Sequence, residues 1–122
     1  MRTCLVVDDS SVIRKVARRI LEGLDFQIVE AEDGEKAIEA CKRAMPEAVL
    51  LDWNMPEVSG IEVVEKLRSQ SAFNGVRLLM VTTETEIEQM ARALEAGADE
   101  YVMKPFTREA VEDKLRLIGV LP

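Results

Sequence analysis

Five polar residues follow or end apolar, strand-like runs of this sequence: Asp8, Asp9, Asp52, Thr82 and Lys104. In an open parallel sheet, ligands bind outside the carboxyl ends of the strands, near the point where the strand order reverses. We therefore expect these side chains to converge at one edge of a sheet. Three acids, a hydroxyl and a lysine in one shallow pocket indicate a divalent cation and phosphoryl chemistry.

The three acids predict both a metal and a nucleophile. Asp8, Asp9 and Asp52 would repel one another without a cation, and the pKa of at least one of them would rise. Mg²⁺ prefers such oxygen ligands, and the chain has no histidine to favour zinc or copper. With the metal in place, one carboxylate can attack phosphorus and form an aspartyl phosphate. Lys104 can supply a point charge and Thr82 a hydroxyl to the phosphoryl oxygens.

The bulk composition excludes several classes of protein. A chain of 122 residues that is 48% hydrophobic and 32% charged suits one soluble domain, residues 1–122, with no output domain. The net charge of −7 argues against nucleic-acid binding. No apolar stretch approaches the roughly 20 residues that cross a bilayer, and the N-terminus lacks a signal-peptide layout, so we expect a cytoplasmic protein. Cys4 and Cys41 are interpreted as small buried hydrophobes.

Short apolar runs alternate with amphipathic stretches along the whole chain. The runs predict strands at residues 3–7, 26–30, 47–52, 76–82 and 99–103. Helices are predicted at residues 11–22, from Asp33-Gly34 to Pro46, after the capping boxes Ser59-x-x-Glu62 and Thr85-x-x-Glu88, and after Thr107, with Gly97 ending the fourth in a left-handed conformation. The resulting (βα)5 pattern implies an α/β fold, a parallel five-stranded sheet with helices on both faces.

The helical stretches also predict which side chains face the core. The first helix has an apolar face formed by Val12, Ile13, Val16, Ala17, Ile20 and Leu21. The second is expected to turn Ala37, Ile38, Cys41 and Met45 inward. The alternating charges of the helices are interpreted as solvated faces.

These residues resemble the signature of the response-regulator receiver domain of two-component signalling, over essentially the whole chain. The similar motifs are Asp8-Asp9, the stretch from Asp52 to Pro56, Met80-Val81-Thr82, and Lys104-Pro105-Phe106-Thr107. The resemblance implies the doubly wound, flavodoxin/CheY-like sheet with strand order 2-1-3-4-5. It also implies a stand-alone, CheY-like chemotaxis-type regulator that is a phosphoprotein and no enzyme on external substrates.

The resemblance assigns roles to individual residues. Asp52 is the phosphoacceptor, and Mg²⁺ is held by Asp8, Asp9, Asp52 and the backbone carbonyl of Asn54, with Asp8 acting largely through water. Lys104 contacts the phosphoryl group, and its bond to Pro105 is expected to be cis. Thr82 and Tyr101 form the switch, and Asn54 and Glu84 tune self-hydrolysis, which is expected to be fast for the family.

The implied function is a phosphorelay step. A histidine kinase or phosphotransfer protein donates from phosphohistidine, and the face of the fourth helix, fifth strand and fifth helix then binds a downstream target. The donor is expected to contact chiefly the first helix, the protein to be a monomer, and the phosphoryl group to be lost by autodephosphorylation. Small Mg²⁺-dependent aspartyl-phosphate phosphohydrolases carry a second acid, their general acid, two residues after the nucleophile, and this chain has Asn54 at that position.

Three alternatives are weighed against this function. A phosphohydrolase would turn over an external phosphomonoester. A flavodoxin-type nucleotide binder would need a phosphate loop rich in Ser, Thr and Gly, where this chain has Asp8-Asp9. A phosphorylation-independent receiver-like adaptor would keep the fold and would not use the acids.

Overall fold

The computed structural model describes residues 2–55, 57–83 and 88–122. The elements, in chain order, are β1 (Arg2–Val7), α1 (Ser11–Glu22), β2 (Phe26–Ala31), α2 (Gly34–Arg43), β3 (Ala48–Asp52), α3 (Gly60–Arg68), the short 3-10 helix η1 (Ser71–Phe73), β4 (Arg77–Thr82), α4 (Met90–Ala96), β5 (Glu100–Met103) and α5 (Arg108–Leu117). Each predicted strand agrees with the observed one to within one residue at either end.

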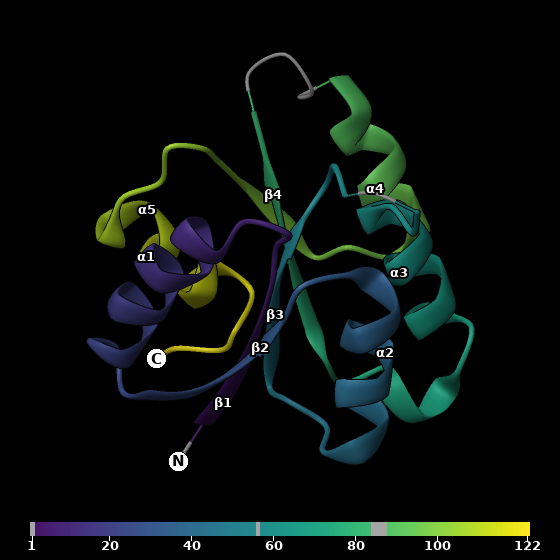
Figure 1. Ribbon diagram of the computed structural model, residues 1–122, viewed down its shortest axis with the longest axis horizontal. Helices are drawn as coiled ribbons and strands as arrows, with labels where there is room; N and C mark the ends of the chain where they lie inside the picture. The colour runs from purple at the N-terminus through teal and green to yellow at the C-terminus, as the bar shows by residue number, and fades with distance from the viewer. Residues whose placement is uncertain (1, 56, 84–87) are drawn as a thin grey trace.

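The five strands form one parallel sheet in the order β2-β1-β3-β4-β5, as predicted. Helices α1 and α5 cover one face, and α2, α3 and α4 cover the other (Figure 1). The chain enters the middle of the sheet with β1, adds β2 on one side and then crosses to β3 on the other. This reversal places a crevice at the carboxyl ends of β1 and β3.

The strands divide their side chains between two cores. In β3, Val49 and Leu51 join the cluster beneath α2, α3 and α4, whereas Ala48 and Leu50 join the cluster beneath α1 and α5. All five residues of β3 are buried, as expected for a central strand with both faces covered. The sheet is therefore anchored on both sides, and its strand ends are held at fixed positions.

Most of the predicted helix ends are confirmed. Ser59 and Glu62 form the reciprocal capping box at the start of α3, and the Thr107 hydroxyl accepts a hydrogen bond from the Ala110 backbone N–H. Gly97 ends α4 with φ at 123°, in the region that favours glycine. Residues 85–87 of the predicted capping box Thr85-x-x-Glu88 lie outside the described residues, so this prediction stays untested.

Two predictions of core-facing residues are wrong. The side chain of Met45 is 50% exposed, because α2 ends at Arg43 and the residue before Pro46 is driven out of the helical conformation. In α1, Val12 and Val16 are 66% and 43% exposed, whereas Ala17 and Leu21 are buried. The inward stripe of α1 is thus narrower than its apolar composition suggests.

The cysteines behave as the sequence predicted. Cys4 and Cys41 are both free and buried. Burial raises the pKa of the Cys4 thiol to about 12 and that of Cys41 to about 11, so both stay protonated near neutral pH. Among the helices that the structure describes, none is both long and apolar enough to cross a membrane.

Candidate functional site

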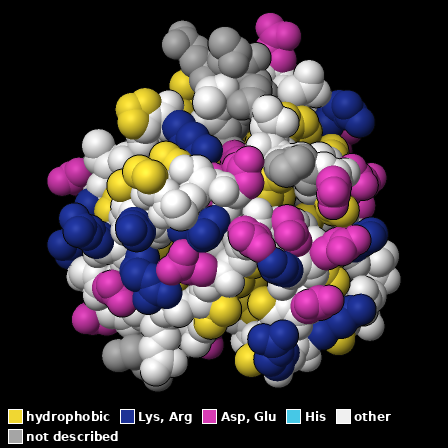
Figure 2. All heavy atoms as spheres, in the orientation of Figure 1, with side chains coloured by type: hydrophobic (Ala, Val, Ile, Leu, Met, Phe, Trp, Pro, Cys, Tyr) yellow, Lys and Arg dark blue, Asp and Glu magenta, His cyan; other side chains and the backbone are white. Residues whose placement is uncertain are grey.

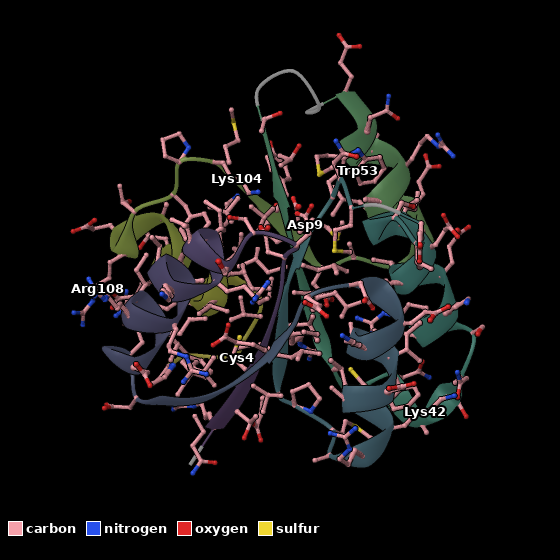
Figure 3. All side chains as sticks on the ribbon, viewed as in Figure 1. Cys4, Asp9, Lys42, Trp53, Lys104 and Arg108 are labelled. Atoms are coloured by element: carbon pink, nitrogen blue, oxygen red, sulfur yellow. The ribbon has the colours of Figure 1, made fainter. Side chains whose placement is uncertain are left out.

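The predicted polar residues do converge at the carboxyl edge of the sheet. Asp8 follows β1, Asp52 ends β3, Thr82 ends β4 and Lys104 follows β5. One carboxylate oxygen from each of Asp8, Asp9 and Asp52 lies within 4.8 Å of the other two. Figure 3 shows Asp9 and Lys104 at this end of the sheet. The strand order has therefore gathered residues that are far apart in the sequence.

Backbone and capping interactions hold Asp8 in place. Its N–H donates to the carbonyl of Ala31 at 3.2 Å, which extends the pairing of β1 with β2 by one residue. Its Oδ1 accepts a hydrogen bond of 2.9 Å from the N–H of Ser10, and the Ser10 hydroxyl in turn caps α1. Because Asp8 is only 3% exposed, these contacts take the place of water around its polar groups.

Lys104 lies between two of the buried carboxylates. Its Nζ is 3.1 Å from Asp8 Oδ2 and 3.3 Å from Asp52 Oδ1. Its own N–H donates to the Thr82 carbonyl at 2.7 Å, which fixes the loop after β5 against β4. Burial lowers the pKa of Lys104, but the hydrogen bonds and charges of Asp8 and Asp52 outweigh it and the net shift is upward. Lys104 is thus a cation held by the acidic cluster, and its bond to Pro105 is cis, as expected.

The ionisation of Asp52 is strongly perturbed by its surroundings. Burial, together with the charge of Asp8, raises its pKa from 3.8 to about 6, although Lys104 and the main chain of Asn54 act in the opposite direction. The side chain of Asp52 is nearly inaccessible, at 6% exposure for the residue. A carboxylate that is costly to ionise in the absence of a cation is a group on which a bound cation has a large effect.

The donor set fits a hard divalent cation. The ligand atoms are carboxylate oxygens, Asp9 is open to solvent, and the cluster contains neither thiolate nor imidazole. Mg²⁺ is bound in this way, by one or two carboxylates and several waters. Lys104 balances part of the negative charge, and the remaining excess would be relieved by the metal.

Gly60 allows the backbone to approach Asp52 closely. A Cβ atom built on Gly60 would lie 2.5 Å from the carbonyl oxygen of Asp52 and 3.0 Å from the Cα of Trp53. The N–H of Gly60 donates to the Trp53 carbonyl at 3.0 Å, so the two segments are tied together at this point. The sequence pointed to Ser59 as a helix cap and gave no role to its neighbour Gly60.

A substitution at Gly60 should therefore disturb both stability and the site. We expect Gly60→Ala to lower the free energy of unfolding by about 1–3 kcal/mol, because backbone atoms must move to admit the methyl group. Gly75→Ala is the matched control, since a Cβ there meets nothing within 4 Å. Urea unfolding of both variants measures the difference, and an equal effect at the two glycines would refute the steric account.

The two residues predicted to form a switch lie in different environments. Thr82 is buried, and its hydroxyl donates to the carbonyl of Thr83 at 3.2 Å, so it is directed to the backbone and not to the acidic cluster. Tyr101 is half-buried against the core beneath α2, α3 and α4. Its ring centroid is 5.0 Å from Nζ of Lys114, which also pairs with Glu100 at 3.4 Å. Tyr101 thus connects β5 to the surface of α5.

Of the two residues predicted to tune hydrolysis, the structure describes only Asn54. Asn54 is exposed, two residues beyond Asp52, and its main chain acts to lower the pKa of the Asp52 carboxyl. Glu84 lies outside the described residues.

Arg14 is a residue near the site that sequence reasoning missed. Its Nη1 donates a hydrogen bond of 2.7 Å to the carbonyl of Asp8, and its side chain is only 15% exposed. In the sequence it looked like one more charge on a solvated helix face. The available signal was its position one helical turn after the cap Ser10, which directs a long side chain back toward the loop.

Comparisons with known proteins consistently match one protein family. The family model described as the response regulator receiver domain matches residues 4–116. The chain is 40% identical over 116 residues to the chemotaxis protein CheY1 of Helicobacter pylori, covering 93% of this chain and 94% of that protein. It is 39% identical over 113 residues to a chemotaxis protein CheY homolog of Campylobacter jejuni, covering 91% and 87%.

Solved structures with the same fold include proteins of the same kind. The chemotaxis protein CheY4 of Vibrio cholerae superposes with a TM-score of 0.89 at 32% identity, covering 97% of this chain and 98% of that one. The receiver domain of the sensor histidine kinase PA1611 of Pseudomonas aeruginosa superposes with a TM-score of 0.86 at 26% identity, with the same coverage. In that structure a magnesium ion is coordinated in the active-site cleft.

Proposed function

This chain belongs to the family of response regulator receiver domains, and from that premise we propose that Asp52 accepts a phosphoryl group with Mg²⁺ bound at Asp8, Asp9, Asp52 and the Asn54 backbone carbonyl. CheY-like receiver domains are signalling proteins that take phosphoryl groups from histidine kinases and act on downstream targets. The observation that carries the proposal is the cluster of three carboxylates with Lys104 paired to two of them.

The transfer is a displacement at phosphorus. An oxygen of the Asp52 carboxylate forms a bond to phosphorus as the bond from phosphorus to the donor's imidazole nitrogen breaks, and the imidazole leaves with the electron pair. The product is an aspartyl phosphate, which carries one more negative charge than the carboxylate. When bound, Mg²⁺ supplies positive charge that offsets the charge on the phosphoryl oxygens.

The residues of the chain orient the group and compensate its charge. Asp8 and Asp9 would hold the metal beside Asp52, which β3 places at the carboxyl edge of the sheet. Lys104 moves its Nζ from the Asp52 carboxylate, where it lies at 3.3 Å, to a phosphoryl oxygen. Because the Lys104 ammonium already lies beside Asp52 before the reaction, it needs to move only a short way to compensate the charge of the phosphoryl group.

Phosphorylation is expected to change the face formed by α4, β5 and α5. The Thr82 hydroxyl leaves the carbonyl of Thr83 and donates to a phosphoryl oxygen, which is the stronger acceptor. Tyr101 then moves inward behind Thr82 and gives up its contact with Lys114. This is a shift between two arrangements of one fold, and the target protein binds the second more tightly.

We assign the donor to the side of the molecule on which α1 lies. Figure 2 shows dark blue Lys and Arg side chains gathered on that side. The exposed side chains of Val12 and Val16 add apolar surface next to the loop that carries Asp8 and Asp9. A phosphohistidine protein with a complementary apolar and acidic surface would fit here.

Val16→Asp should affect phosphorylation by a protein donor but not phosphorylation by a small-molecule donor. The aspartate places charge in the apolar part of the proposed contact and should slow transfer from a phosphorylated histidine kinase about tenfold or more. Phosphorylation by a small phosphoramidate should stay unchanged, because that donor needs no protein surface. Leu94→Asp, on the exposed side of α4, is the matched control. Equal rates from the kinase for Val16→Asp and wild type would place the donor elsewhere.

Loss of the phosphoryl group is expected to be intrinsic to the protein. Asn54 is exposed beside Asp52, where water can reach phosphorus, and we propose that it tunes this hydrolysis together with Glu84. The family assignment favours this signalling cycle over an external phosphohydrolase activity. Steady turnover of a phosphomonoester would support the phosphohydrolase instead, and a lifetime of hours would contradict fast self-hydrolysis. We also expect a monomer that acts through protein contacts.

Trp53 offers a direct test because it follows Asp52 in the chain and is the single tryptophan. Its fluorescence should change on addition of Mg²⁺ and change again with a small phosphoramidate donor. Asp52→Asn should lose the second change. A response to Mg²⁺ without a response to the donor, together with an unchanged mass, would support a phosphorylation-independent adaptor.

A further inference from the structure

Arg14 bridges two parts of the molecule that meet next to the acidic cluster. Its Nη1 donates to the backbone carbonyl of Asp8 at 2.7 Å, and its Nε donates to Oε1 of Glu30 at 2.9 Å. Glu30 lies on β2, on the same side of the sheet as Ile28, which packs against the core beneath α1 and α5. One guanidinium thus joins α1, β2 and the loop that follows β1.

The contact with Asp8 completes a set of restraints on that residue. The Asp8 N–H is bonded to Ala31, its Oδ1 to the Ser10 N–H and its Oδ2 to Lys104. The carbonyl is the remaining polar group, and Arg14 satisfies it with a charge-assisted bond. Without Arg14, this carbonyl would have to find water or turn, and the Asp8 and Asp9 side chains would turn with it.

Glu30 fixes the orientation of the Arg14 side chain. Its carboxylate accepts from Arg14 through one oxygen and from Arg18 through the other, at 2.9 and 2.8 Å. Burial opposes ionisation of Glu30, but the hydrogen bonds from Arg18 and Arg14 outweigh it, and the pKa of Glu30 is lowered. The carboxylate therefore stays charged across the neutral range and keeps the planar guanidinium in one geometry.

We propose that Arg14 is a positioning residue for the metal site, acting through the Asp8 backbone and held by Glu30. The inference rests on the proposed function, because it concerns the Mg²⁺ bound at the same carboxylates. Residues that orient metal ligands from behind commonly change metal affinity by about 10- to 100-fold when removed. Within the part of the chain that the structure describes, the hydrogen bonds of the Arg14 side chain go to Glu30 and to the Asp8 carbonyl and not to Asp52, so Arg14 is not assigned to the transfer step itself.

Whether the loss of Arg14 weakens or strengthens Mg²⁺ binding distinguishes a positioning role from a purely electrostatic one. Removing a cation next to three carboxylates should strengthen Mg²⁺ binding if electrostatics alone matter. If Arg14 positions Asp8, removing it should weaken Mg²⁺ binding despite the lost repulsion. Arg18 provides the matched control, because it pairs with the same Glu30 and, among the described residues, its hydrogen bonds go to Glu30 and Glu22.

The experiment is a Mg²⁺ titration of the whole protein, followed by Trp53 fluorescence at constant ionic strength. We expect Arg14→Gln to raise the Mg²⁺ dissociation constant about tenfold or more, and Arg18→Gln to leave it equal or lower. Arg14→Lys keeps the charge but cannot hold both partners, so it should also weaken binding. Thermal unfolding of each variant establishes that the fold is retained.

A second measurement distinguishes positioning from general damage to the site. At saturating Mg²⁺, the phosphorylation rate of Arg14→Gln with a small phosphoramidate should return to within about twofold of wild type, while half-saturation needs about tenfold more Mg²⁺. Unchanged or tighter Mg²⁺ binding in folded Arg14→Gln would overturn the inference and leave the proposed function standing. Failure of the wild-type protein to bind Mg²⁺ would overturn both.

Discussion

Asp52→Asn is expected to make the metal-free protein more stable at neutral pH. The native fold raises the pKa of Asp52 from 3.8 to about 6, so the folded protein binds this proton more tightly than the unfolded chain does. As pH rises from about 4 to about 6, the unfolded state loses the proton first and stability falls by up to about 3 kcal/mol. Asparagine has no charge to desolvate, and the variant should recover most of that loss.

The pH profile identifies the cause of this stabilisation. Urea unfolding in EDTA should show the largest advantage of Asp52→Asn above about pH 6 and almost none below about pH 4. Adding Mg²⁺ should reduce the difference in stability between Asp52→Asn and the wild type, because the metal binds the folded wild type and stabilises it. Asp113→Asn, at a carboxylate that is 79% exposed, should have little effect. If Asp52→Asn were less stable than the wild type at about pH 8 without metal, the fold would not raise the pKa of Asp52 as described.

Arg68→Ala is expected to lower the free energy of unfolding more than Gly60→Ala does. The Arg68 guanidinium donates to the carbonyls of Gly97, Phe73 and Val76 at 2.9, 2.8 and 2.7 Å. It also pairs at 2.9 Å with Asp99, whose carboxylate accepts from the Leu78 N–H. Alanine leaves several part-buried acceptors without this donor, and we expect a loss of about 3 kcal/mol or more.

Arg116→Ala is the control for this loss. Arg116 is 51% exposed and forms ion pairs with Glu112 and Asp113 on its own helix. Exposed pairs of this kind contribute little, so the change should lie within about 0.5 kcal/mol. Equal midpoints of thermal unfolding for the two variants would show that the Arg68 contacts are not what joins α3 to the starts of β4 and β5.

The sequence was sufficient to predict the sheet and the convergence of the acids. Alternation of strand and helix predicted the parallel architecture, and the placement of Asp8, Asp52 and Lys104 after strands predicted their meeting. Strand order came from the resemblance, because periodicity records which segments are strands and not which strands are neighbours. The order observed agrees with it.

Other features depend on tertiary packing and were not accessible from local patterns. The exposure of Val12 and Val16 depends on how α1 is rotated against the sheet, which apolar content alone does not specify. Arg14 and Gly60 act through backbone carbonyls supplied by other segments. The hydrogen bond from the Thr82 hydroxyl to the Thr83 carbonyl also depends on the local backbone, and it would have to break for Thr82 to take the proposed role at a phosphoryl group.

The measurement that tests the central claim most directly is the intact mass of the protein after reaction with a small phosphoramidate. With Mg²⁺, the wild-type protein should gain the mass of one phosphoryl group, on a hydroxylamine-sensitive acyl phosphate in the peptide that contains Asp52. EDTA or the substitution Asp52→Asn should abolish the gain. A phosphoryl group on another residue, or equal labelling of Asp52→Asn, would contradict the assignment of Asp52 as the phosphoacceptor.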